Sequence, residues 1–189
     1  MARRTVGALL TQADVTLADN LTGDISAADV RDLIKDAIDT FKPGFGAVSN
    51  DSVVLPLLFT TPTVIPYTTL LAVTVDFTAT VALGTVRRNA LGLPTVNNRI
   101  SFYADVFAAA GADIAINLYR DGVQVPGGIT VAGRGAATPT SCGFEILNAT
   151  PIAGDPVYEI RAAKVSGAAA NVGFNNVRFI LEVIPTLGV

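Results

Sequence analysis

Histidine and tryptophan are absent from this 189-residue chain, and cysteine occurs once, at Cys142. These absences exclude a Ser-His-Asp triad, a Cys-His pair, a histidine-containing zinc site and an intrachain disulfide, because each needs a residue that the sequence lacks. Cys142 alternates with Phe144 and Ile146, a pattern that favours a buried small side chain on one strand face over a reactive thiol. We expect no cofactor, no metal site and no enzymatic activity.

Charged residues are scarce as well, at 15% of the chain with a net charge of -3. A negative field without a Lys/Arg run disfavours nucleic acid as a partner. No apolar stretch reaches the roughly 18 residues of a membrane span, and the first apolar stretch ends before the about 7–15 residues of a secretory signal. Half of the residues are nevertheless hydrophobic, so we expect other protein chains, and no membrane, to cover part of the surface.

Charge density divides the chain into two parts near residue 50. Residues 1–50 carry seven acidic and five basic residues, whereas the 139 residues that follow carry nine and eight. The first part is polar between its apolar positions, and the second is rich in alternating apolar residues. We therefore predict a helical segment with a linker over residues 1–50 and a β domain over residues 51–189.

The first part contains two helical patterns. Val6, Leu9 and Leu10 recur at helical spacing and predict a short helix. Ser26 can cap a second helix, with Asp29 three residues later as in a capping box. An apolar stripe then follows one face of that helix: Val30, Leu33, Ile34, Ala37, Ile38 and Phe41. An isolated helix of this length is only marginally stable in water. The stripe must therefore pack on the β part, on the same helix of a sister chain or on a foreign surface.

From about Val53 onward the hydrophobic period changes to two. The longest alternation, from Leu71 to Leu83, predicts one long strand with one buried face. Asp121-Gly122 predicts a hairpin turn. Further strands are predicted at residues 100–106, 114–118, 123–125, 129–131, 142–146, 158–162 and 177–183. Because no crossover helix separates these strands, the fold class is mainly β, an antiparallel sandwich preceded by a short α-helical segment.

Candidate catalytic groups are limited to carboxylates. A pair of them would suffice for glycoside hydrolysis, but most fall at outward strand positions or in turns, where a solvated or interface role is expected. The candidates are Asp105, Asp113, Asp121, Glu145, Asp155, Glu159 and Glu182. Four tyrosines could supply a sugar-stacking face: Tyr67, Tyr103, Tyr119 and Tyr158.

Two sets of residues carry a resemblance to known proteins. Residues 17–31 (LADNLTGDISAADVR) are similar to short N-terminal modules that recur in head-fibre, decoration and tail proteins of tailed bacteriophages. Four later motifs together resemble the TNF/C1q-like jelly roll that such proteins use: NRISF at 98–102, LYRDG at 118–122, VYEIR at 157–161 and FNNVRF at 174–179. The resemblance covers about two thirds of the chain, and its motifs are loose.

The resemblance implies a homotrimer of jelly rolls whose N-terminal segment grips a phage particle. The protein would be a capsid decoration or cement protein of the head-fibre type, found in the virion and made in the bacterial host cytoplasm. Its partner would be the major capsid protein or another virion protein. The apolar stripe would be the particle-docking helix, and Val6, Leu9 and Leu10 its anchor. The stretch Val53–Phe59 would add an edge strand or a capsid contact.

Two other functions remain open. One is a tail fibre or baseplate protein that binds a host receptor, glycan or protein, through the loops Val86–Asn97 and Ala132–Ser141. The other is a glycan hydrolase that uses two of the carboxylates.

Overall fold

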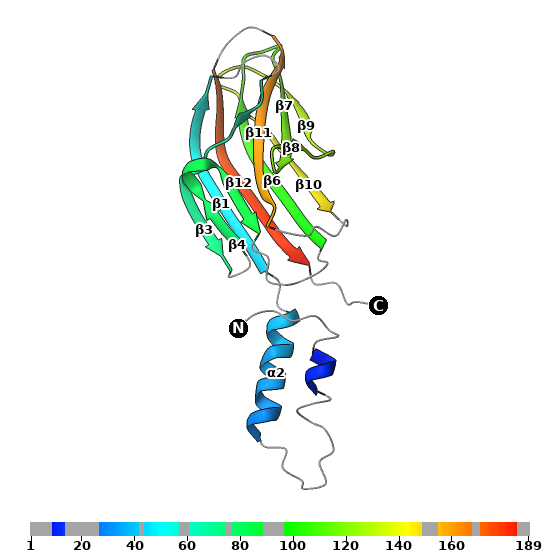
Figure 1. Ribbon diagram of the computed structural model, residues 1–189. Coiled ribbons are helices and arrows are strands. Elements are labelled where there is room, and N and C mark those ends of the chain that lie inside the picture. Colours follow the sequence, from blue (N-terminus) through cyan, green and yellow to red (C-terminus); the bar gives the residue numbers. More distant parts are fainter. Residues whose placement is uncertain are drawn as a thin grey trace.

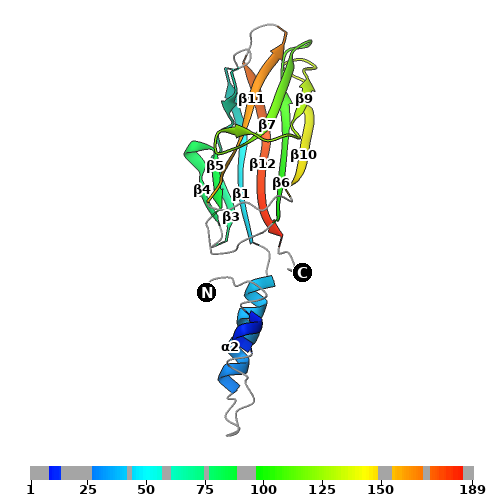
Figure 2. The same cartoon turned by 45° about the vertical axis from the view of Figure 1, so that its right-hand side comes forward.

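The computed structural model describes residues 9–13, 27–41, 44–56, 61–74, 77–88, 97–148, 155–167 and 171–184. Residues 9–13 are helical, and helix α2 spans Ala27–Phe41, as the apolar stripe predicts, while the expected cap Ser26 lies outside the described residues. Nearly all the remaining regular structure is β, and it forms two facing antiparallel sheets (Figures 1 and 2). The predicted fold class is confirmed.

Sheet A contains five strands in the order β10-β6-β12-β1-β3. Their bounds are β1 Gly44–Leu55, β3 Thr69–Val73, β6 Asn97–Phe107, β10 Thr140–Asn148 and β12 Val172–Ile184. Sheet B has the order β4-β5-β11-β7-β8, with β2 on β11 and β9 on β7. Its strands are β2 Thr63–Val64, β4 Phe77–Thr80, β5 Thr85–Arg88, β7 Asp113–Arg120, β8 Val123–Gln124, β9 Ile129–Ala132 and β11 Val157–Ser166.

The strand order identifies the sandwich as a jelly roll. From β6 onward the chain alternates between the sheets: β6 lies in sheet A, β7 to β9 in sheet B, β10 in A, β11 in B and β12 in A. Long connections of this kind place strands distant in sequence side by side, as in the double Greek key. The jelly roll implied by the resemblance is thus present.

The core lies between the sheets and follows the predicted alternation. Every second residue of β6 and of β7 is buried: Ile100, Phe102, Ala104, Val106, Ile114, Ile116 and Leu118. Aromatic rings fill the centre, with 5.5 Å between the ring centroids of Phe102 and Phe144. Asp121 and Gly122, with φ of 51° and 78°, form the predicted hairpin turn between β7 and β8.

The single long strand predicted from Leu71 to Leu83 is wrong. Strand β3 belongs to sheet A and β4 to sheet B, and residues 81–83 form a 3-10 helix. Leu71 and Val73 are 50% and 42% exposed, whereas Phe77 is buried. The apolar alternation in the sequence continues although the chain passes from sheet A to sheet B. The period alone therefore does not reveal that β3 and β4 pair with strands of different sheets.

Strand β1 also differs from its prediction. It begins at Gly44, so it runs through the boundary placed at residue 50. Residues 53–55, which begin the stretch expected to add an edge strand or a capsid contact, pair with β12, whereas β1 pairs with β3 over Gly46–Ser49. Residues 57–59 of that stretch lie outside the described ranges.

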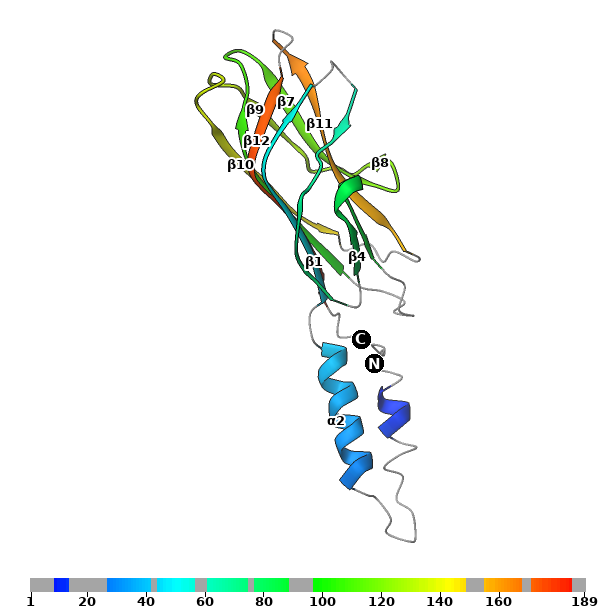
Figure 3. The ribbon, with the colours of Figure 1, turned by 90° about the vertical axis from the view of Figure 1, so that its left-hand side faces the viewer.

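Helix α2 lies beyond one pole of the sandwich, below the end at which β1 begins (Figure 3). Strand β12 ends at the same pole, since Gly44 pairs with Val183. The connections at residues 108–112 and 133–139 lie at the opposite pole, where Thr140 pairs with Val106. The molecule therefore has a helical end and a loop-bearing end.

Candidate docking and assembly surfaces

Helix α2 presents an apolar row to solvent. Val30, Ile34 and Ile38 are 40%, 53% and 61% exposed, and they are spaced four residues apart along one line of the helix. Leu33 and Ala37, from the same predicted stripe, are only half-exposed. The side chain of Phe41 lies outside the described set.

Residues 9–13 form a short helix next to α2. They lie alongside α2 in Figures 1 and 3. Leu9 is buried, whereas Leu10 is 61% exposed. The proposed anchor therefore contributes one packed and one exposed leucine, and Val6 lies outside the described residues. We define the docking row as Val30, Ile34 and Ile38.

A second surface lies on the outer face of sheet A. Directly paired residues of antiparallel strands share a face, and Phe45 pairs with Glu182, Glu182 with Arg99, and Arg99 with Leu147. Phe45 and Leu147 are 38% and 59% exposed. Between them the Arg99 Nε lies 2.9 Å from Glu182 Oε2, and it lies 3.6 Å from Glu145 Oε1. This face combines exposed apolar groups with a three-residue ion-pair cluster.

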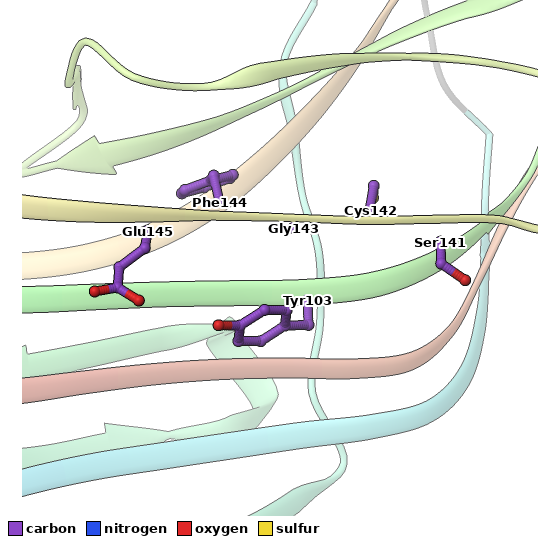
Figure 4. Close-up of a pocket in the computed structure, with 6 residues that line it drawn as sticks. All are labelled: Tyr103, Ser141, Cys142, Gly143, Phe144 and Glu145. Atoms are coloured by element: carbon purple, nitrogen blue, oxygen red, sulfur yellow. The ribbon is translucent and has the colours of Figure 1, made fainter.

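The same face carries a shallow depression on β10 and β6 (Figure 4). In Figure 4, Cys142 and Phe144 point to one side of β10, and Ser141 and Tyr103 lie on the other. The Tyr103 ring packs so closely on Gly143 that a Cβ there would lie 2.6 Å from Tyr103 Cδ1. Glycine at position 143 therefore makes room for the tyrosine.

A polar network adjoins this depression. Asp105 accepts hydrogen bonds from Ser141 Oγ at 2.5 Å and from Asn176 Nδ2 at 2.8 Å. These two bonds favour the charged form and hold the pKa of Asp105 below its usual range. Asn176 has a φ of 52°, at a register shift in β12 opposite β6. The network thus fixes an irregular point of sheet A.

A third apolar surface follows the edge of the sandwich at β3. Leu70, Leu71 and Val73 are 45%, 50% and 42% exposed. Leu83, in the 3-10 helix that follows β4, is 66% exposed. Strand β3 is the edge strand of sheet A, and Thr74 just beyond it is hydrogen-bonded to Phe45, so this edge borders the face of sheet A.

The candidate carboxylates all hold structural contacts. Asp113 accepts from Ser166 Oγ at 2.7 Å, and Asp121 accepts from the Val157 backbone N–H at 2.9 Å. The remaining pairs are Asp155 with Arg87, Glu159 with Arg161, Glu145 and Glu182 with Arg99, and Asp105 with Ser141 and Asn176.

The four tyrosines that could have supplied a sugar-stacking face do not share one exposed surface. Tyr67, Tyr119 and Tyr158 are buried, and only Tyr103 of the four is exposed, at 47%. Tyr119 instead packs beneath Arg161, whose guanidinium carbon lies 4.4 Å from the ring centroid. Inward alternation and the cover of neighbouring segments remove the other rings from the surface.

Cys142 has the environment that the sequence predicts. It is half-buried against the core, and desolvation together with the nearby Asp105 charge raises the pKa of its thiol to about 11. Within the described ranges, no group of three or more Cys, Asp or Glu side chains could hold a metal ion. Neither described helix is long and apolar enough to cross a membrane.

The comparisons with known proteins match this chain to solved structures alone. No protein-family model and no curated protein matches the sequence. Among solved structures, the globular domain of zebrafish complement 1qA protein matches 77% of this chain and 98% of its own, with 9% identity and a TM-score of 0.49. The Eiger TNF from S. frugiperda matches 78% and 96%, with 13% identity and a TM-score of 0.43.

A CBM35 from Paenibacillus barcinonensis matches 71% of this chain and 96% of its own, with 10% identity and a TM-score of 0.31. These identities are too low to bear on function. The jelly-roll assignment therefore rests on the strand order described above.

Proposed function

We propose that this chain is a non-enzymatic structural protein of a tailed-bacteriophage particle, a capsid decoration or cement protein of the head-fibre type. It docks on the particle through the helical segment that precedes β1 and projects a trimeric jelly roll. The observation that carries the proposal is the docking row, which α2 holds in solvent beyond one pole of a complete sandwich. Exposed apolar rows of this kind mark protein–protein contacts.

The homotrimer is supported by the two apolar patches on the sandwich. The outer face of sheet A carries Phe45 and Leu147, and the edge strand β3 carries Leu71 and Val73. A contact between the β3 edge of one copy and the sheet A face of the next would be heterologous. Such contacts close into a ring when the rotation from one copy to the next is a whole fraction of a turn. Three copies in such a ring would cover both patches and leave none at an open end.

Three docking helices on one trimer could attach the protein firmly to the particle even if each helix binds weakly. After the first helix binds, the second and third events are effectively intramolecular, so the attachment is far tighter than one helix alone provides. The partner in this proposal is the major capsid protein or another virion protein, with no nucleic acid, membrane or cofactor. The chain would be made in the host cytoplasm and would reside in the virion, on the capsid surface.

Immunogold electron microscopy of the phage that encodes the chain tests the proposal, with an antibody against the sandwich. Label over the head is the expected result. Absence of label on the virion overturns the function. Sedimentation velocity of the full chain tests the trimer, and a monomer at micromolar concentration would contradict it.

A tail fibre or baseplate protein that binds a host receptor is the alternative. The loop Ala132–Ser141 favours it, because residues 133–139 lie at the pole opposite α2 and are largely exposed. The other loop, Val86–Asn97, joins β5 to β6, and Asn97 pairs with Ile184 at the helical pole. Its residues 89–96 lie outside the described ranges. Gold label at the tail tip would replace capsid decoration by this alternative.

A further inference from the structure

The two basic residues of α2 lie on one edge of the docking row. Successive residues of a helix are about 100° apart, so Val30 and Ile38 lie about 40° to either side of Ile34. On the Ile38 side, Arg31 lies about 60° and Lys35 about 100° from Ile34. Both are exposed. The row therefore has a basic edge.

The stability of the helix does not explain this edge. Arg31 and Lys35 are four residues apart, and like charges at that spacing destabilise an isolated helix. Lys35 Nζ lies 3.9 Å from Asp32 Oδ1, an exposed pair that offsets only part of this repulsion. The helix as a whole is acidic, because it has two basic residues and four acidic ones: Asp29, Asp32, Asp36 and Asp39.

The opposite edge of the row is neutral. Residues 9–13 (LLTQA) lie alongside α2, where Leu33 and Ala37 are half-buried, so they border the row on its other side. None of these five residues carries a charge. Among the described residues, the docking row therefore has basic residues along one edge and uncharged residues along the other.

We propose that the docking row binds an apolar groove on the phage particle that carries carboxylates along one rim, facing Arg31 and Lys35. This inference rests on the proposed function and names the chemistry of its partner surface. A row of three side chains at four-residue spacing needs three apolar subsites about 6 Å apart, over about 12 Å. The single acidic rim fixes the direction in which the helix lies in the groove.

Charge complementarity favours an acidic-rimmed protein groove as the partner of the docking row over a lipid surface and over a second copy of this chain. Helices that lie on anionic lipid are rich in Lys and Arg on their polar face, whereas α2 has four acidic residues and only two basic ones. A second copy in antiparallel contact would place the basic edges of the two helices together. In parallel contact it would place the basic edge against uncharged residues 9–13 of its neighbour. Neither arrangement gives Arg31 an acidic partner.

Co-sedimentation of the full chain with particles that lack it tests the groove, at about 50 mM and about 300 mM salt. Arg31→Glu should weaken binding about tenfold or more at low salt, and the difference should narrow at high salt, because rim charges act on association and are screened. Arg31→Lys should bind nearly as wild type does. Arg134→Glu is the matched control, because it makes the same change in charge at an exposed residue of the opposite pole.

The outcomes separate the groove from the function. If the wild-type chain does not sediment with the particles, the proposed function is overturned. If it binds and Arg31→Glu binds equally well at both salt concentrations, the acidic rim is overturned and the docking function stands. If Ile34→Gln converts the free oligomer to monomer, a second copy covers the row. If the chain sediments with phosphatidylglycerol vesicles, lipid covers it, and either of these last two results overturns the groove.

Discussion

Replacing the docking row by Val30→Gln, Ile34→Gln and Ile38→Gln together should abolish particle binding and leave the sandwich intact. Glutamine is a good helix former, so α2 should persist in the variant. The change removes only the apolar surface that the structure leaves exposed.

The magnitude follows from the exposed fractions. Complete burial of a Val or Ile side chain stabilises by about 1.5–3 kcal/mol. Because these side chains retain 40%, 53% and 61% of their exposure, docking can gain about 1 kcal/mol from each, or about 3 kcal/mol from the row. That is about 100-fold in the dissociation constant of one helix, and more when three helices of a trimer dock together.

Two assays check this prediction. Co-sedimentation with particles measures binding, and thermal unfolding followed by circular dichroism measures the sandwich. Surface changes of this kind usually alter stability by within about 0.5 kcal/mol, so the unfolding midpoint should stay close to wild type. Val123→Gln, at a 70% exposed residue of β8, is the control for loss of an exposed apolar side chain. Wild-type particle binding by the triple variant would refute the reasoning.

Three further predictions concern the sandwich. Gly143→Val should destabilise it by about 1–3 kcal/mol in urea unfolding, because the new side chain meets the Tyr103 ring; an unchanged midpoint would contradict this packing. The folded pKa of Asp105 is depressed, so its stabilising contribution is complete above about pH 4 and is lost as the pH falls through the folded pKa. Unfolding free energy should therefore fall more steeply below pH 4 in wild type than in Asp105→Asn, and parallel curves would exclude the effect. With a thiol pKa of about 11, about 0.1% of Cys142 should be thiolate at pH 8. Cys142 should therefore react with a disulfide reagent far more slowly in the folded protein than in the protein unfolded by urea, and equal rates would contradict this prediction.

Hydrophobic periodicity was sufficient to predict a strand that stays within one sheet of the sandwich. The alternation of Ile100 to Val106 and the Asp121-Gly122 turn each reflect a local rule, so both could be predicted. The chain crossing between Val73 and Phe77 could not, because the choice of sheet depends on pairing partners far away in sequence.

The early start of β1 was missed for a different reason. Gly44 and Gly46 resemble the end of a helix and a linker. In the fold, a Cβ at position 46 would lie 3.0 Å from Val86 Cγ1 and 3.1 Å from Phe77 Cβ. Glycine is needed there for the approach of sheet B, which the local sequence does not reveal.

The residues of the docking helix could be predicted from the sequence, but which of them are exposed to solvent could not. Helical spacing identified the stripe that includes Leu33 and Ile34. In the fold Ile34 is exposed and Leu33 is half-buried, and residues 9–13 lie alongside α2. Such an arrangement is tertiary, and helical spacing alone does not reveal it.

The pairing of β1 with β12 constrains how the protein can be made on the ribosome. These strands are the first and last of the described sandwich, and they lie side by side through eleven paired positions. At about 5–20 residues per second, Ile184 is synthesised roughly ten seconds after Leu55, so β1 must wait that long for its neighbour. The α2 row leaves the ribosome before either strand. A nascent chain therefore exposes its apolar row throughout synthesis, and we expect chaperones at the ribosome to contact that row first.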